Sequence, residues 1–247
     1  MFAYAIGVTA AGLLGAAGYQ TVSPTGQWYG QTFTGLKPGT KKLALTYDDG
    51  PNDVHTHKLL DVLAKHGVPA TFFLIGRYVQ MRPKIACDVA AAGHVIGNHT
   101  FTHPNLAYAS AVQTRIQIEQ SRQVLHDVIG EHSNLFRPPF GGRRPGTLNI
   151  VRALGLEPIM WNVTAFDWKT TSAERVERTI CKRVRGGNVI LLHDGGHRSL
   201  GADRAHSVEA TDRVIRRYKE ADYEFVTIPQ MMTAKAVAGP LLKPASG

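Results

Sequence analysis

The chain has 247 residues, of which 43% are apolar and 19% are charged, and this composition excludes a wholly disordered protein. The length is typical of one barrel or doubly wound domain with a sizeable core. A formal charge of +9 suggests contact with something acidic, such as nucleic acid, anionic lipid or an anionic cell-wall polymer. No dense basic block with interleaved aromatic residues occurs, so nucleic-acid binding is disfavoured and a solvated basic surface is the simpler interpretation.

The N-terminal segment predicts export. Residues 1–19 are apolar and rich in Ala and Gly, and the first charged side chain is Lys37. The stretch is similar to the apolar region of a signal peptide, although the usual basic residue before it is missing. It is also just long enough to be an uncleaved membrane anchor, and a buried N-terminal helix is the structural alternative. We therefore expect an extracytoplasmic protein, secreted or held at the cell envelope, in which residues 20–41, rich in Gly, Thr, Ser and Pro, form a linker.

From residue 42 onward, strand and helix patterns alternate. Most of the predicted strands are apolar runs, as expected for strands buried on both faces. They are Leu43–Tyr47, Ala70–Ile75, His94–Gly97, Leu135–Arg137, Glu157–Val163, Asn188–Leu192 and Glu224–Ile228. The predicted helices are Asp53–His66, Ser110–Ile129, Thr147–Leu154, Ala173–Val184 after an N-cap at Ser172, and a last helix capped by Ser207 that ends near Tyr218.

This alternation predicts a single α/β domain over residues 42–232. Short crossovers imply parallel strands with right-handed connections. Seven strands in this length favour a distorted or incomplete β/α barrel, and an open doubly wound sheet is the alternative. Residues 233–247 are expected to form a flexible tail. Cys87 and Cys181 both lie in helical patterns without a C-x-x-C spacing, and two buried small apolar side chains are the favoured interpretation. One disulfide between them is the alternative if the chain is exported.

Five polar groups follow apolar runs, at the strand ends where catalytic residues collect on β/α scaffolds. The first is Asp48-Asp49, followed by Gly50-Pro51. Neighbouring strand residues point in opposite directions, so the two carboxylates share one site only if the chain turns there. One carboxylate can then bind a metal while the other acts as a base. An Asp-Asp-Gly turn with no catalytic role is the structural alternative.

The second group contains His99 and His103, four residues apart. On a helical turn this spacing places two imidazoles on one face, where they can bind a metal. With Asp49 they form a set of two histidines and one carboxylate that leaves coordination positions open for water and substrate. Such a set suits zinc and also non-haem iron, so the ligand types leave the metal open.

The remaining groups supply an arginine and a second histidine. Arg137 precedes Pro138-Pro139 and is expected to pair bidentately with Asp48. His193 ends a strongly apolar strand and can act as an acid if a carboxylate raises its pKa. Asp167 is the expected partner, and Trp168 beside it is expected to form a wall of the cleft. A structural arginine and a hydrogen-bonded core histidine are the alternatives.

In this order the five groups resemble the motifs of polysaccharide deacetylases with a NodB homology domain, carbohydrate esterase family 4. The family pattern T-F-D-D-G-P stands here as Thr46–Pro51, H-[ST]-x-x-H as His99–His103, R-x-P-[FY] as Arg137–Phe140, and the strand before a histidine as Ile190–Asp194. The fourth motif, D-x-x-D-W, is present only in its second half, Asp167-Trp168, because Thr164 stands where the first Asp is expected. The resemblance covers residues 42–232.

The resemblance implies a distorted (β/α)7 barrel and a metal-dependent hydrolase that removes acetyl groups from polysaccharides such as peptidoglycan or chitin oligomers. It implies Asp48 as the base, oriented by Arg137, and His193 as the acid, tuned by Asp167. It further implies Asp49, His99 and His103 as ligands of a divalent metal, usually Zn²⁺, with Co²⁺ or another divalent ion as alternatives. The backbone N–H of Phe140, which replaces the more frequent Tyr, is implied to hold the oxyanion.

Neither departure from the family pattern touches the base, the acid or a metal ligand, so we expect activity to be kept and substrate preference to shift. The substrate can carry N-acetyl or O-acetyl groups, and related cyclic-amide hydrolases are a more distant option. A non-catalytic wall-associated or carbohydrate-binding protein is the alternative from another class. Such a protein should have lost part of the site, whereas this chain retains all of it.

Overall fold

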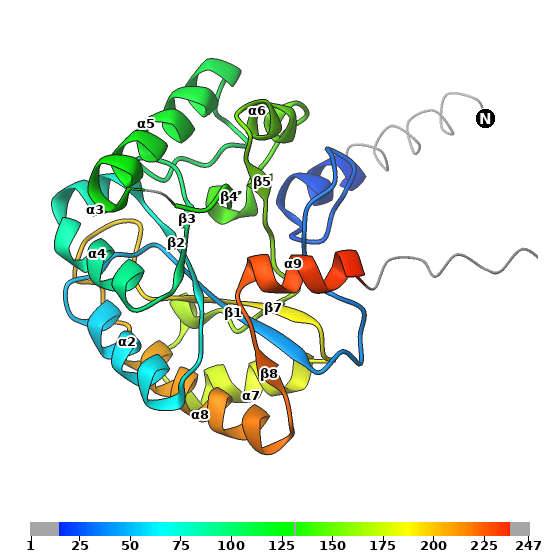
Figure 1. Cartoon of the computed structure of the whole chain (residues 1–247). Helices are drawn as coiled ribbons and strands as arrows, with labels where there is room; N and C mark the ends of the chain where they lie inside the picture. The colour runs from blue at the N-terminus through cyan, green and yellow to red at the C-terminus, as the bar shows by residue number, and fades with distance from the viewer. Residues whose placement is uncertain (1–14, 131, 238–247) are drawn as a thin grey trace, which may run out of the picture.

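The described strands run parallel in one curved sheet, with helices packed around its outer face (Figure 1). The computed structural model describes residues 15–130 and 132–237. The strand order is β5-β4-β3-β2-β1-β7-β6, and β8 pairs with the start of β1. The strands are β1 (Lys42–Asp48), β2 (Thr71–Leu74), β3 (Val95–Asn98), β4 (Leu135–Phe136), β5 (Glu157–Pro158), β6 (Val163–Thr164), β7 (Asn188–His193) and β8 (Glu224–Phe225). The predicted α/β class and parallel pairing are confirmed.

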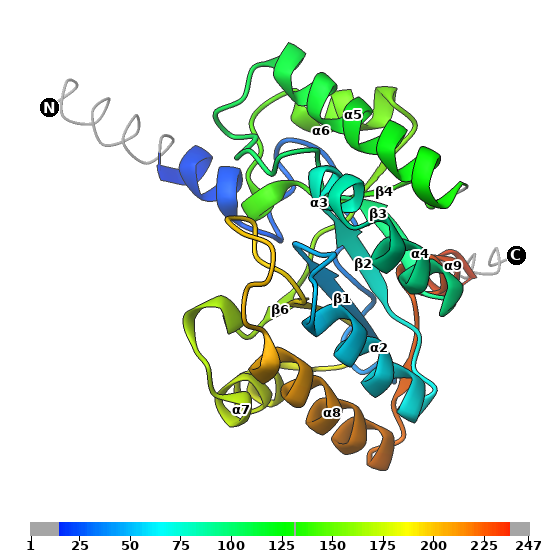
Figure 2. The same cartoon turned by 90° about the vertical axis from the view of Figure 1, so that its left-hand side faces the viewer.

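The helices α2 to α8 lie between consecutive strands, as the crossovers of a parallel sheet require, and α9 follows the last strand. They are α2 (His55–His66), α3 (Gly76–Met81), α4 (Pro83–Ala91), α5 (Ala111–Ile129), α6 (Thr147–Ala153), α7 (Ala173–Arg183), α8 (Ala205–Glu220) and α9 (Ile228–Val237). Two 3-10 turns, η1 (Pro139–Gly141) and η2 (Asp167–Lys169), follow β4 and β6. Figure 2 shows α7 and α8 side by side along one flank of the sheet.

One of the two predicted serine caps is confirmed, and the structure adds a serine cap that was not predicted, at Ser110. Ser110 forms a capping box with Gln113 at the start of α5, and the Ser172 side chain accepts the Arg175 N–H at the start of α7. The cap predicted at Ser207 is wrong, because α8 already begins at Ala205. The Ser207 hydroxyl instead donates a hydrogen bond to Asp167. Tertiary structure therefore gave this serine a different partner.

The predicted strand count needs one correction. The run Glu157–Val163 is not one strand but contains β5 and the start of β6, separated by residues around Trp161. The last predicted strand, Glu224–Ile228, is also shorter, because Ile228 already begins α9. Residues 233–237 of the predicted tail belong to α9, and the rest of it, residues 238–247, lies outside the described residues.

The segment predicted as a linker packs against the barrel instead of extending away from it. The Phe33 N–H donates to Pro158 O at 3.0 Å, and the Met160 N–H donates to Phe33 O at 2.8 Å. Two residues further on, Gly35 forms an antiparallel bridge with Asn188 at the start of β7. The edge strands of the sheet are β5 and β6. Residues 33–35 lie between the residues that follow β5 and the start of β7. The segment completes the barrel wall at this point.

Side-chain alternation along β1 divides the core into two layers. Leu43, Leu45 and Tyr47 belong to the large cluster between the sheet and the outer helices, whereas Ala44 belongs to a smaller cluster inside the barrel. The inner cluster includes Phe73, Met160 and Trp161. Because the barrel is filled, chemistry is possible only at its ends.

Three further expectations concern the N-terminus and the cysteines. The predicted signal or anchor lies mainly outside the described residues, although residues 15–22 are helical. Among the described residues, no helix has the length and apolar character needed to cross a membrane. Cys87 and Cys181 are unbonded, but the prediction that both are buried is wrong, because Cys87 is exposed and Cys181 is half-buried.

A buried arginine fixes the N-terminal segment to the loop after β4. Arg143 is 1% exposed, and its guanidinium donates to Gly141 O at 2.9 Å and to both Ser23 O and Gly26 O at 2.7 Å. Its backbone N–H also donates to Thr21 O. Burial lowers the pKa of Arg143. A buried guanidinium is tolerated here because its donors meet carbonyl oxygens from both segments.

Replacing Arg143 by Met should therefore destabilise the protein by about 2–4 kcal/mol, since several buried carbonyls lose their donor. Urea unfolding followed by circular dichroism measures the change. Arg144→Met is the matched control, because Arg144 is less buried, and it should change stability by less than about 0.5 kcal/mol. Equal effects of the two variants would contradict this role for Arg143.

Candidate active site

The parallel register brings the predicted polar groups to one rim of the barrel. Asp48, at the end of β1, pairs in register with His193 at the end of β7 and with Phe73 on β2. On the other side of β2, Leu74 pairs with Asn98, the residue before His99. Arg137 directly follows β4, and its backbone N–H donates to Asn98 O. Four of the five groups therefore meet across neighbouring strand ends.

The two adjacent aspartates share this site because the backbone turns between them. Asp49 has φ of 71°, a left-handed conformation that Asp tolerates better than most residues. The turn predicted from Gly50-Pro51 thus begins one residue earlier. Both carboxylates are buried, with exposures of 3% for Asp48 and 4% for Asp49.

His99 and His103 are brought together by a loop and not by the helical turn that their spacing suggested. Residues 99–103 are irregular, and both Thr100 and His103 have positive φ, at 65° and 62°. The Thr100 hydroxyl accepts the His103 N–H at 3.1 Å, which stabilises this conformation. The two imidazole rings lie 4.8 Å apart in an edge-to-face arrangement.

Asn98 and Gln117, which the sequence did not single out, hold this loop in place. Asn98 Oδ1 accepts the Thr100 N–H, and Asn98 Nδ2 donates to Ile118 O on α5. Gln117 Oε1 accepts the N–H groups of Phe101 and Thr102. The contacts of Asn98 with Ile118 and of Gln117 with Phe101 and Thr102 join residues that are distant in the chain, so no local pattern indicated them.

Asp49, His99 and His103 form a buried set of three metal-ligand side chains, whose ligand atoms lie within 4.8 Å of one another. Asp49 Oδ1 lies 3.0 Å from His103 Nε2 and 3.6 Å from His99 Nε2. Ligands at about 2.1 Å from a tetrahedral zinc are separated by about 3.4 Å, so these distances suit one ion.

The tautomer of His99 supports the same conclusion. His99 Nδ1 lies 2.8 Å from Arg137 O, and a carbonyl can only accept, so Nδ1 carries the proton. In the neutral ring Nε2 then presents a lone pair toward Asp49, and a cation between these two acceptors would satisfy both of them. Burial raises the pKa of the Asp49 carboxyl, but the neighbouring residues His103, His197 and His99 outweigh burial and hold this pKa well below the ordinary value. The residues present therefore fit a divalent metal.

Arg137 is completely buried and holds Asp48 from inside the barrel. Its Nη1 donates to Asp48 Oδ1 at 2.7 Å and to Thr46 Oγ1 at 2.9 Å. The bidentate pairing predicted from the sequence is wrong, because the other guanidinium nitrogens face the carbonyls of Ile159 and Met160. Asp48 Oδ2 is left facing the metal ligands, 3.7 Å from His99 Nε2.

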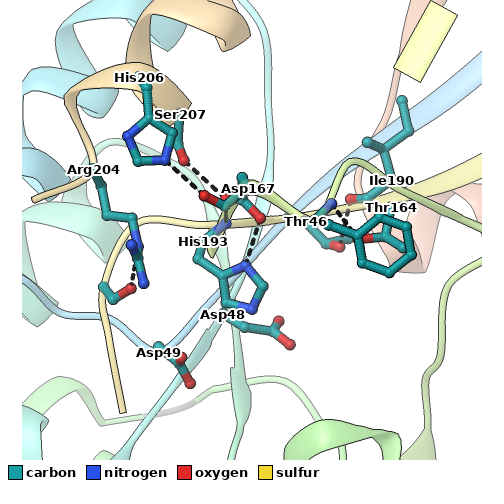
Figure 3. Close-up of polar contacts among 12 residues, drawn as sticks. Thr46, Asp48, Asp49, Thr164, Asp167, Ile190, His193, Arg204, His206 and Ser207 are labelled. Carbon is teal, nitrogen blue, oxygen red and sulfur yellow. Dashed lines mark hydrogen bonds and ion pairs between the residues drawn. The ribbon is translucent and has the colours of Figure 1, made fainter. Parts of the chain in front are cut away.

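On the opposite side of the rim, Asp167 orients His193 as predicted (Figure 3). Asp167 Oδ1 lies 2.9 Å from His193 Nδ1, and Asp167 Oδ2 accepts the His193 backbone N–H and the Ser207 hydroxyl, both at 2.8 Å. His206 Nε2 donates to the Asp167 carbonyl at 2.8 Å. The N-terminal turn of α8 therefore fixes Asp167, which in turn fixes the imidazole.

The carboxylate also changes the charge state of this histidine. Burial alone would lower the pKa of His193, but the charge and hydrogen bond of Asp167 outweigh burial and raise it to about 9. Burial likewise opposes ionisation of Asp167, yet His193 and Ser207 keep its pKa below the ordinary value. At neutral pH, His193 therefore carries a proton that it can give to a reacting group.

Exposed aromatic rings line the rim. Phe140 is 49% exposed and lies against His103, with ring centres 4.6 Å apart, whereas Trp168 is 43% exposed and lies 5.0 Å from the His193 ring. His197, which the sequence interpretation missed, stacks on His103 at 4.8 Å, and its backbone N–H donates to Asp49 Oδ2. His197 lies four residues after His193, the same spacing as between His99 and His103, but the sequence interpretation did not use this pair.

The half-missing fourth motif has a local explanation. The Thr164 hydroxyl accepts the Phe166 N–H at 3.3 Å, and its carbonyl accepts Arg183 Nη1 at 2.9 Å. A short side-chain acceptor at this position stabilises the turn that leads to Asp167, and Thr can do so as Asp can. Thr164 does not contact the metal ligands. The departure at this position therefore leaves the Asp167–His193 pair intact.

The buried side chain of Asp194 explains why position 50 is a glycine. Asp194 is buried and accepts a hydrogen bond from Thr56 Oγ1 at 2.5 Å. Its carboxylate occupies the space that a Cβ at Gly50 would need. Burial raises the pKa of Asp194 to about 7. Position 50 therefore requires glycine, because the Asp194 carboxylate fills the space beside it.

Comparison with known proteins gives a consistent family. Residues 35–159 match the family model for polysaccharide deacetylases. A peptidoglycan-N-acetylglucosamine deacetylase of Bacillus cereus is 37% identical over 206 residues, which cover 82% of this chain and 72% of that protein. A chitooligosaccharide deacetylase of Sinorhizobium fredii is 34% identical over 198 residues, with 78% and 92% of the two chains covered.

The fold agrees with this relationship. A crystal structure of a peptidoglycan N-acetylglucosamine deacetylase superposes with a TM-score of 0.75 at 35% sequence identity, and the match covers 81% of this chain and 92% of that one. The barrel fold is thus shared with this structure. The chain belongs to the polysaccharide deacetylase family.

Proposed function

We propose that the protein removes acetyl groups from an N-acetylated sugar polymer, peptidoglycan N-acetylglucosamine in the first instance, with Zn²⁺ as its metal. The observation that carries the proposal is the arrangement of a buried Asp49-His99-His103 set beside Asp48, with a protonated His193 across the rim. The most similar relatives given above act on peptidoglycan and chitooligosaccharide, as their names state. The apolar residues 1–19 support a site of action outside the cytoplasm.

Each residue then has one task in hydrolysis. A divalent metal held by Asp49, His99 and His103 would polarise the acetyl carbonyl and lower the pKa of a water molecule. Asp48 accepts the proton of the attacking water at Oδ2, because Arg137 occupies Oδ1. The backbone N–H of Phe140 donates to the developing oxyanion.

His193 completes the reaction by protonating the departing nitrogen. An amine is a poor leaving group unless it is protonated, whereas a sugar alkoxide needs less help. The raised pKa of His193 keeps the acid available at neutral pH, which supports an N-acetylated substrate over an O-acetylated one. Trp168 and Phe140, on opposite sides of the site, offer faces on which sugar rings can pack.

Asp48→Asn should reduce acetate release by at least about 10³-fold, since it removes the base. Zinc content, measured by mass spectrometry, should be unchanged because Asp48 is not a ligand in this assignment. His99→Ala should lose both zinc and activity. Loss of zinc in the Asp48 variant, together with activity in the His99 variant, would reverse the assigned roles.

Removal of the metal should lower the thermal stability of the protein. Restoring Zn²⁺ at about 100 times its dissociation constant should stabilise the folded state by about 2.7 kcal/mol. The effect is measured as the melting temperature before and after chelation and reconstitution. His103→Ala should abolish the response, whereas Glu119→Gln on the outer face of α5 should keep it. A response that survives in the His103 variant would place the zinc elsewhere.

The pH dependence of kcat should report His193. The acid form is lost as pH rises through its pKa of about 9, so activity should fall on the alkaline side near that value. Asp167→Asn removes the carboxylate that raises this pKa and leaves the effect of burial, so the alkaline limb should move toward pH 6.5 or lower. Asp127→Asn, at an exposed position on α5, is the control. An unchanged alkaline limb in the Asp167 variant would exclude His193 as the acid.

A further inference from the structure

The charged residues of α7 fall into two groups with different surroundings. Its two acidic residues face α8, where Glu174 lies 2.6 Å from Arg213 and Glu177 lies 3.8 Å from Arg217. The basic residues Arg175, Arg178 and Lys182 are exposed, and none has an ion-pair partner in the part of the chain that the structure describes. The acidic groups of α7 are thus neutralised by arginines of α8, while the three cations face solvent.

The unpaired cations form one continuous surface. Arg175, Arg178 and Lys182 are spaced at i, i+3 and i+7, which places them on one face of the helix. With Thr179, they line a shallow depression. An adjoining depression is also lined by Arg175 and Thr179, and it adds Lys169, Arg183 and Phe166. The two depressions share their boundary, so the positive surface runs along α7 toward the active site.

Aromatic rings connect this surface to the catalytic rim. Arg183 Cζ lies 5.0 Å and Lys169 Nζ lies 5.6 Å from the centre of the Phe166 ring. Phe166 lies 5.4 Å from Trp168, which in turn lies 5.0 Å from His193. A chain of contacts therefore runs from His193 through Trp168 and Phe166 to Arg183 on α7.

The backbone at Phe166 is held in a conformation that exposes its ring. Phe166 has φ of 54°, which costs a bulky L-residue about 1–2 kcal/mol, and the side chain is 37% exposed. Phe166 belongs to none of the buried hydrophobic clusters, and its ring lies between Trp168 and the cations. A ring presented in this way can pack against a sugar face.

We propose that this surface, which we call the α7 track (Phe166, Lys169, Arg175, Arg178, Lys182 and Arg183), binds the anionic groups of the glycan whose acetyl group is at His193. The inference rests on the proposed function and names its substrate class as a glycan that carries carboxylate groups. Guanidinium groups pair well with carboxylates, and the aromatic rings between them and His193 suit the intervening sugars. A neutral glycan would leave the cations without partners.

Continuity with the site favours a substrate over other anionic macromolecules. A lipid surface or a nucleic acid would need positive charge but would not require the track to end at the catalytic acid. The aromatic rings that connect the track to His193 are accounted for if the same molecule occupies both. Five of the cations that contribute to the net charge of +9 lie in this track.

The test compares two triple variants with the same change of charge. Arg175→Gln, Arg178→Gln and Lys182→Gln together remove three cations from the track. Lys37→Gln, Lys58→Gln and Arg115→Gln remove three exposed cations elsewhere and serve as the control. The readout is the ratio of kcat/KM for peptidoglycan, with its peptide carboxylates, to kcat/KM for a neutral chitin oligomer. This ratio should fall at least about 5-fold in the track variant, through KM, since each exposed pair contributes modestly. It should not change in the control, and equal ratios in the two variants would overturn the proposal.

A binding measurement separates this inference from the proposed function. Both triple variants are combined with Asp48→Asn, and cosedimentation with insoluble peptidoglycan is measured at low and high salt. The track variant should bind more weakly at low salt and show less salt dependence than the control. If the parent protein released acetate from no substrate, the proposed function would fail. The binding measurement would still show whether the α7 track binds peptidoglycan. Unchanged peptidoglycan binding with reduced binding to anionic lipid vesicles or to DNA would contradict the proposal.

Discussion

The parallel register of β1 with its two neighbours is the constraint on which the site depends. It sets Asp48 opposite His193 on one side and Phe73 on the other, so the base and the acid are neighbours although 145 residues separate them in the chain. A shift by one residue would turn Asp48 away from the barrel interior and Tyr47 into it. The alternation of small and large residues in β1 opposes such a shift, since Ala44 fits the inner layer and Leu45 the outer one.

A buried charge inside the barrel is the second constraint. Arg137 and Asp48 are both withdrawn from water, which is costly unless their hydrogen-bonding groups are satisfied. The guanidinium meets this requirement through Thr46, the carbonyls of Ile159 and Met160, and the Phe73 ring at 4.1 Å. The pair therefore holds the base in one orientation, which a solvent-exposed pair could not do.

Backbone strain is concentrated around the same rim. Positive φ occurs at six non-glycine residues of the described chain, and five of them flank the site, namely Asp49, Thr100, His103, Phe140 and Phe166. Each costs about 1–2 kcal/mol, so the rim is stable only because the sheet and its supporting amides fix it. These backbone conformations direct side chains toward the site. In a regular strand or helix, the same side chains would point elsewhere. It also explains why the two metal-ligand histidines are joined by a loop where their spacing favoured a helical turn.

The sequence by itself determined the α/β class, the parallel strands and the strand-end residues, because buried strands and polar termini leave a local signal. It also indicated the Asp49-His99-His103 set, since residue types and spacing carry that information. Only the tertiary structure decided the division of Glu157–Val163 into two strands, the packing of residues 33–35 against the barrel and the single-nitrogen contact of Arg137 with Asp48. It alone assigned Ser207 to Asp167 and identified Asn98, Gln117 and His197. These features depend on partners far apart in the chain, which no local pattern encodes.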